Sequence, residues 1–182
     1  FGLAAMSHRH GVFGMQQPLP PIVKYGLTFL FVQSEFGLCC PLSMTDSLTR
    51  TLTKFGDKKL IDKFFDQLTS QDLDHLFQGA MFMTEQHAGS DVGSIDTYAE
   101  CEDGNWFLTG DKWFCSNPDA DLAMVLARHN KKISGTKGLA LFLLPKKLEN
   151  GDPNNYEIIR LKDKLGGRSF ASGEIKLNRA FA

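Results

Sequence analysis

Residues 83–92, which read MTEQHAGSDV, gather groups that could hold an anionic ligand. They follow an apolar stretch directly, so we expect them to form the loop that leaves a strand. Gly89 would let the backbone approach a ligand closely, and Ser90 would offer its hydroxyl and its backbone N–H to a pyrophosphate oxygen. Asp91 would turn away, because its charge repels an anion. Serine and aspartate beside glycine are also common in ordinary turns, and the loop alone leaves that interpretation open.

A second segment, KWFCSN at residues 112–117, could hold a flat heterocycle. In a strand, side chains two residues apart point to the same face, so Phe114 and Ser116 would lie together. The aromatic ring could stack on a ligand ring while the hydroxyl donates to a ring nitrogen or oxygen. The alternative is that Phe114 belongs to the core and Ser116 ends a strand.

The hydrophobic spacing predicts the elements that position these segments. From residue 21 to about 68 the spacing is helical, with one helix beginning at Pro41 and ending at Gly56 and another over 58–68. After a polar break, short apolar stretches alternate with turn signals such as 103–104 and 109–111. The predicted strands cover residues 78–83, 95–101, 106–108, 112–116, 122–127, 139–144, 156–161 and 174–177. We therefore predict an α+β fold in which a helical segment precedes an antiparallel β-sandwich or small barrel.

Composition narrows the class of protein further. The chain has 182 residues, 42% of them hydrophobic, and a net charge of -1. It has no apolar run near the ~18 residues that a membrane span needs. Four cysteines without a CxxC pair favour a reduced, cytoplasmic compartment over a disulfide framework or a zinc site. The chain lacks an initiator Met and stops within a predicted strand, so we expect a fragment of a longer protein.

The charge is unevenly distributed. From residue 128 onward, twelve Lys and Arg stand against five Asp and Glu. Such a segment is compatible with a phosphorylated ligand, with nucleic acid, or with an ordinary solvated face.

Three motifs in order resemble the middle domain of the acyl-CoA dehydrogenase flavoproteins. They are MTEQHAGSDV, GDKWFCSN and LKDKLGGRSFASGEI, and within the superfamily they look most like the branch with the adaptive alkylation-response flavoprotein. The resemblance implies a middle β-domain over residues 77–182, preceded over 1–76 by part of the family's N-terminal helical domain. Gln86 stands where the family usually has proline, a departure shared with that branch.

The resemblance also implies an FAD site. In the family, the residue at Thr84 donates to the pyrimidine end of the flavin, and the residue at Ser90 contacts the pyrophosphate. Phe114 would stack on the ring system in place of the usual tryptophan, and Ser116 would hydrogen-bond the N5 atom. The full set of cofactor-binding residues expected on this basis is Met81, Met83, Thr84, Gly89, Ser90, Phe114, Cys115 and Ser116, the two methionines through their backbone.

The implied activity is α,β-dehydrogenation of an acyl-CoA thioester. The catalytic carboxylate would come from a C-terminal four-helix domain that this chain does not contain, so no catalytic residue is assigned here. The full-length protein is expected to be a dimer or tetramer. Two alternatives stay open: a DNA-linked protective role with little dehydrogenase activity, as in the alkylation-response branch, and a scaffold with a vestigial flavin site.

Other polar residues indicate less about the function of the protein. His8 and His10 could ligate a metal, but no neighbouring carboxylate or cysteine completes a set, and no metal site is predicted. His87 is expected to face solvent. Glu85 is an improbable catalytic base, because the family's base lies over the other face of the flavin. Arg168 is interpreted as a turn residue.

Overall fold

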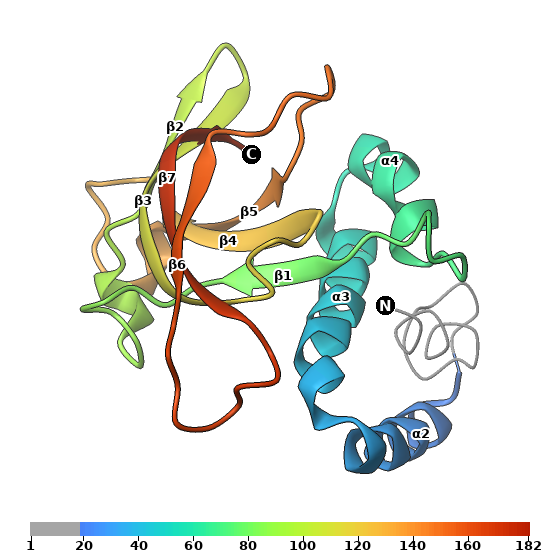
Figure 1. Ribbon diagram of the computed structural model, residues 1–182. Helices are drawn as coiled ribbons and strands as arrows, with labels where there is room; N and C mark the ends of the chain where they lie inside the picture. The colour runs from blue at the N-terminus through green and yellow to red at the C-terminus, as the bar shows by residue number, and fades with distance from the viewer. Residues whose placement is uncertain (1–18) are drawn as a thin grey trace. The chain divides into compact units, whose positions relative to one another are not determined.

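The computed structural model describes residues 19–182, and His8 and His10 lie outside this range. The described chain divides into two compact units. One is the chain up to Gly79 together with Gly166–Phe170, and the other is Ala80–Leu165 with Ala171–Ala182. The predicted order, helices first and then a β-domain, is confirmed (Figure 1).

From residue 19 onward, the first unit contains three helices, α2 (Pro21–Ser34), α3 (Phe36–Phe55) and α4 (Lys58–Leu68). Helix α4 has the predicted bounds and begins where the Asp57 carboxylate accepts a hydrogen bond from the Leu60 N–H at 2.8 Å. Pro21 occupies the first turn of α2, where its missing N–H costs no helical hydrogen bond. Gly56 follows the last residue of α3, as predicted.

The prediction that a helix begins at Pro41 is wrong. Helix α3 begins five residues earlier, at Phe36, and contains Pro41 in its interior. The Glu35 carboxylate accepts from the Gly37 N–H at 2.8 Å, which satisfies one of the unpaired donors at the helix start. Pro41 lies in the second turn of α3 and, having no N–H, cannot donate to the carbonyl of Gly37 four residues earlier.

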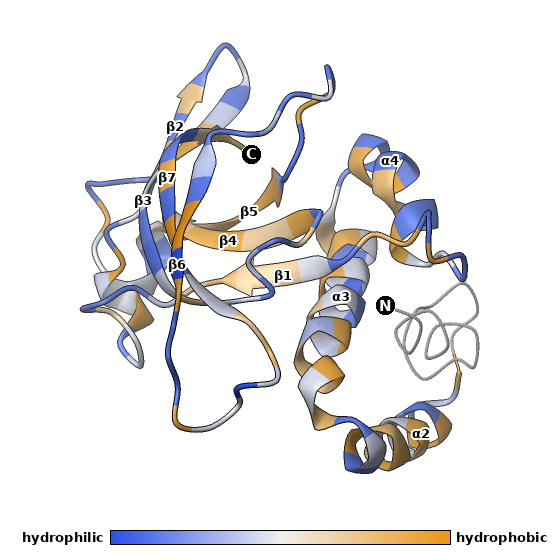
Figure 2. Ribbon diagram, in the orientation of Figure 1, coloured by the Kyte–Doolittle hydropathy of each residue, from blue (hydrophilic) through white to orange (hydrophobic). Residues whose placement is uncertain are grey.

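The second unit is built on one seven-stranded sheet. Its strands pair in the order β1–β4–β2–β3–β7–β6, β5 adds to β4, and β1 also pairs with β3, so that β1, β4, β2 and β3 close a ring. The strands are β1 (Gly79–Phe82), β2 (Tyr98–Glu102), β3 (Asn105–Ser116), β4 (Leu122–Arg128), β5 (Leu139–Pro145), β6 (Tyr156–Leu161) and β7 (Ser172–Phe181). Figure 2 shows hydrophobic residues concentrated on β4 and β5, which pair along their whole length. Buried residues from β1, β2, β3, β4, β5 and β7 form the core.

One predicted turn does not exist. Residues 109–111 were expected to separate two strands, but they lie inside the single long strand β3. Gly110 has φ +147°, and a Cβ there would lie 2.6–2.9 Å from atoms of Thr97. The glycine is therefore required by a close approach between two backbone segments at a register shift, and not by a reversal of the chain.

Candidate functional site

The fold brings the two predicted binding segments side by side. Met81 of β1 lies opposite Ser116 of β3 in an antiparallel pair. Just beyond the strand, the Trp113 N–H donates to the Thr84 carbonyl oxygen at 2.8 Å. The segment that enters the loop and the strand with the aromatic ring thus form one continuous surface, although about thirty residues separate them in the sequence.

On β3, the side chains around Cys115 alternate as predicted. The Phe114 ring is 52% exposed, Cys115 is 1% exposed and Ser116 is half-buried. Lys112 breaks the alternation because the pairing with β7 shifts by one residue between Lys112 and Cys115. The Cys115 side chain points into the core, so it can meet a ligand on the Phe114 side only through its backbone. Burial raises the pKa of its thiol to about 12, so the thiol stays protonated.

A buried ion pair joins the loop to the strand. The Lys112 ammonium lies 2.9 Å from a Glu85 carboxylate oxygen, and it also donates to the Met83 carbonyl at 3.1 Å. Glu85 accepts two further hydrogen bonds, from the backbone N–H groups of Asp96 and Thr97. These contacts tie both ends of the loop to β3.

The protonation state of Glu85 follows from this arrangement. Burial raises the pKa of its carboxyl, but hydrogen bonds from Thr97, Lys112 and Asp96 outweigh that effect and hold the pKa below its ordinary value. Glu85 is therefore a charged residue whose carboxylate anchors the loop to β3. Its structural role was missed in the sequence, where nothing marks Lys112 as its partner.

The part of the loop after Ala88 is exposed to solvent. The backbones of Glu85 and Ala88 hydrogen-bond each other in both directions, which leaves Gly89 and Ser90 exposed after a tight turn. A Cβ on Gly89 would meet no described atom within 4 Å, so the fold itself does not require glycine there. His87 is exposed as predicted, with its Nε2 atom 3.0 Å from a carboxylate oxygen of Asp96.

Arg128 fixes the segment that follows this loop. Its guanidinium donates to the carbonyl oxygens of Gly93 at 2.7 Å, Ile95 at 3.2 Å and Ile133 at 2.8 Å. One arginine at the end of β4 thus holds two loops that have few backbone hydrogen bonds of their own. Arg128 had been counted only as part of the basic last third of the chain.

Part of that basic excess has local partners. Four of its cations lie within 2.8 Å of a carboxylate oxygen, in the pairs Lys146–Asp119, Arg160–Glu174, Lys162–Glu174 and Arg179–Glu102. Arg168 lies in an exposed turn, where the Phe170 N–H donates to Gly167, in agreement with its interpretation as a turn residue.

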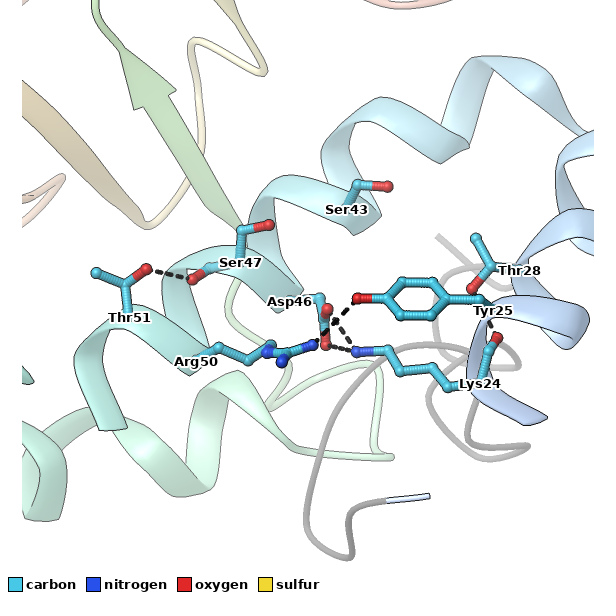
Figure 3. A pocket seen from close by; sticks show the side chains of 8 residues that line it. All are labelled: Lys24, Tyr25, Thr28, Ser43, Asp46, Ser47, Arg50 and Thr51. Carbon is cyan, nitrogen blue, oxygen red and sulfur yellow. Dashed lines mark hydrogen bonds and ion pairs between the residues drawn. The ribbon is translucent and has the colours of Figure 1, made fainter. Parts of the chain in front are cut away.

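A separate pocket of about 340 Å³ lies between α2 and α3 in the helical unit (Figure 3). Every residue that lines it carries a polar group, and the Lys24 ammonium lies 2.5 Å from both oxygens of the Asp46 carboxylate. The Arg50 guanidinium donates to the Tyr25 hydroxyl at 3.3 Å. Because its buried charges neutralise each other across the two helices, we interpret this pocket as a structural joint.

Residues 19–182 contain neither a metal-binding cluster of side chains nor a helix that could span a membrane. In this range, no group of three or more His, Cys, Asp or Glu side chains is arranged to hold a metal ion. None of the described helices is long and apolar enough to cross a membrane.

Comparison with known proteins identifies the class of this fold and site. The family model for the acyl-CoA dehydrogenase middle domain matches residues 80–180, which is more than half of the chain. The chain therefore belongs to the acyl-CoA dehydrogenase family, and the resemblance of its three motifs is confirmed.

Individual relatives support the same family assignment. The chain is 39% identical to acyl-CoA dehydrogenase family member 11 of Caenorhabditis elegans, an alignment that covers 93% of this chain and 30% of the relative. It is 38% identical to putative acyl-CoA dehydrogenase AidB of Escherichia coli, over 83% of this chain and 28% of the relative. The crystal structure of Caenorhabditis elegans ACDH-11 in complex with C11-CoA superimposes with a TM-score of 0.86 at 35% identity, covering 98% of this chain and 33% of that one. The chain thus spans about a third of the length of the relatives it matches.

Proposed function

We propose that this chain forms the flavin-binding part of an FAD-dependent acyl-CoA dehydrogenase. The observation that carries the proposal is the pairing of Met81 with Ser116, together with the hydrogen bond from Trp113 to Thr84. It aligns on one surface the residues that the family resemblance assigns to the flavin ring. The side chains of Phe114 and Met81 are exposed and that of Ser116 is half-buried, so these three are not part of the core.

The groups present fit the proposed cofactor. The exposed Phe114 ring offers a flat apolar face for a ring system, and the hydroxyls of Thr84 and Ser116 offer hydrogen bonds beside it. Gly89 and Ser90 lie in the open part of the loop, where a pyrophosphate could approach the backbone closely. The Glu85–Lys112 pair would keep loop and strand in register, so the groups that meet the ring and those that meet the pyrophosphate are positioned together.

In the proposed reaction, the residues of this chain bind and orient the FAD cofactor. When bound, FAD supplies the acceptor for the hydride that leaves the β-carbon of the thioester, while a carboxylate outside this chain removes the α-proton. Ser116 would hold the N5 end of the ring system, and Thr84 would donate where negative charge collects. We expect the full-length protein to be a dimer or tetramer in which a neighbouring subunit completes the adenine end of the site.

The test is an anaerobic titration of the full-length protein loaded with FAD. Acyl-CoA thioesters of increasing chain length are added while the visible flavin absorbance is followed. Bleaching by one chain-length class supports the dehydrogenase and identifies its substrate. A retained flavin that no thioester bleaches contradicts it and favours the alternative with a DNA-linked role, which salt-dependent binding to duplex DNA would then test. A protein that retains no FAD contradicts both and favours a scaffold.

A further inference from the structure

Lys162, the first residue after β6, has an unusual environment for a lysine. Its side chain is only 9% exposed, and its ammonium lies 3.2 Å from the centre of the Trp113 ring and 4.6 Å from the centre of the Phe114 ring. A cation this close to aromatic faces is attracted by the negative charge of the π-system. The exposed ring of the proposed flavin site therefore rests against a nearly buried positive charge.

Glu174 of β7 fixes this ammonium. One of its carboxylate oxygens lies 2.6 Å from the Lys162 ammonium and 2.8 Å from the Arg160 guanidinium, and the Glu174 side chain is 11% exposed. The Lys162 backbone N–H also donates to the Ser172 carbonyl at 2.8 Å. Lysine side chains are normally free to move, but this one is held at its backbone, along its stem and at its charge.

The charge around the rings is positive overall. Three cations, Arg160, Lys162 and Lys164, follow one another at alternate positions along this segment. Two carboxylates stand against them: Asp163, next to Lys162 in the chain, and Glu174, which Arg160 and Lys162 share. The Lys164 ammonium donates at 2.9 Å to the hydroxyl of Ser172, which lies opposite Ser116 in the sheet. A ligand stacked on Phe114 would therefore lie in a positive potential that its protein surroundings only partly neutralise.

We propose that Lys162 is a positioning residue of the flavin site, which orients the Phe114 ring and favours the reduced, more negative form of the cofactor. This inference rests on the proposed function. It adds that the reduction potential of the flavin depends on the Lys162 ammonium. This cation does not touch the cofactor and acts through the Phe114 ring.

The test uses five variants of the full-length protein. Lys162→Met removes the charge but keeps an apolar stem, Lys162→Arg keeps the charge, and Glu174→Gln leaves the charge uncompensated. Lys132→Met, at an exposed position, is the control for the loss of one lysine. For each variant we would measure the FAD midpoint potential, FAD affinity and the tryptophan fluorescence of the cofactor-free protein, with Trp113→Phe to assign the signal.

We expect Lys162→Met to lower the midpoint potential and to weaken FAD binding on the order of tenfold, because both the charge and the orientation of the ring are lost. Lys162→Arg should remain close to wild type, and Glu174→Gln should raise the potential. The emission of Trp113 should change in Lys162→Met even without cofactor. Lys132→Met should leave all three quantities unchanged.

Three results would overturn the inference. These are an unchanged potential in Lys162→Met, an equal fall in Lys162→Arg and Lys162→Met, or a fall in Glu174→Gln. If Lys162→Met fails to fold, Lys162→Arg and Glu174→Gln still decide between charge and packing. Wild-type protein that binds no FAD would refute the proposed function, and this inference with it, whereas normal wild-type binding with unaffected variants refutes the inference alone.

Discussion

At the scale of single residues, the most specific prediction concerns Ser116. Its hydroxyl is half-buried at the end of β3, opposite Met81. If it donates to the flavin N5 atom, Ser116→Ala in the full-length protein should shift the visible flavin spectrum and the midpoint potential, by an amount equivalent to one hydrogen bond, about 1 kcal/mol. The melting temperature should change little. Ser116→Thr, which keeps a hydroxyl, is the control, and an Ala variant with wild-type flavin properties would refute the assignment.

Phe114 should matter for retention of the cofactor more than for its redox behaviour. Removing the ring in Phe114→Ala takes away the stacking surface, which is worth about 1 kcal/mol beyond the buried area. We expect FAD to dissociate roughly five to ten times more readily, as measured by flavin fluorescence after dilution. Phe114→Trp restores a flat ring and should retain FAD. Equal retention in the Ala and Trp variants would show that the ring does not contact the flavin.

The lowered pKa of Glu85 predicts how the stability of the folded protein depends on pH. Its pKa in the folded protein lies below the ordinary value of 4.5, because three donors favour the carboxylate. The stabilisation is therefore complete above about pH 4.5 and is lost as the pH falls through the lower folded value. Glu85→Gln should lower the melting temperature at pH 7 and flatten its decline below pH 5.

Glu157→Gln, which changes an exposed carboxylate on β6, is the control for that experiment. It should leave both the melting temperature at pH 7 and the acid limb unchanged. A Glu85→Gln protein whose melting curve keeps the wild-type dependence on pH would mean that Glu85 is not the group whose protonation destabilises the fold.

At the scale of elements, the joint between α2 and α3 depends on a charge pair. Lys24 is 3% exposed and Asp46 is 7% exposed, and each neutralises the other. Removing one partner leaves the other charge buried, at a cost of about 3–5 kcal/mol. We expect Asp46→Asn to lower the unfolding free energy by that order in a urea titration. Asp62→Asn, at an exposed position of α4, should change it by less than about 0.5 kcal/mol.

The Lys24–Asp46 pair is better described as specifying how α2 packs against α3 than as stabilising that packing. Replacing both residues with apolar ones, Lys24→Met with Asp46→Leu, should recover most of the stability that the single variant loses. A double variant as unstable as Asp46→Asn would show instead that the hydrogen-bonded charges stabilise the joint in their own right.

At the scale of the whole molecule, the chain corresponds to about a third of its relatives. We expect the 182-residue chain on its own to bind FAD more weakly than the full-length protein and to show no bleaching with acyl-CoA, because the proposed function places the catalytic carboxylate and the adenine end of the site outside these residues. Equilibrium dialysis of both proteins against FAD measures the difference. Bleaching in the short chain would require a base within these residues and would refute the proposed division of labour.

The sequence by itself determined the class of the protein and the order of its elements. Local signals were sufficient for this: helical apolar spacing over 58–68 for α4, apolar runs for β4 and β5, and a loop motif after a strand for the site. These features depend on residues a few positions apart, so they can be recognised without knowing the fold. The same signals gave wrong predictions at Pro41 and Gly110. Proline usually marks a helix start, but α3 begins earlier, at the Glu35 cap. Glycine usually marks a turn, but Gly110 allows two backbone segments to approach closely.

Only the tertiary structure decided which residues meet. Lys112 reaches Glu85 across 27 positions, and Lys162 reaches the ring of Trp113 through a sheet pairing with β7. The sequence shows both lysines as ordinary charges, because burial and register are set by strands that are distant along the chain. The groups that could bind a flavin were readable one by one, whereas the charges that hold and tune them became visible only once the sheet had placed them together.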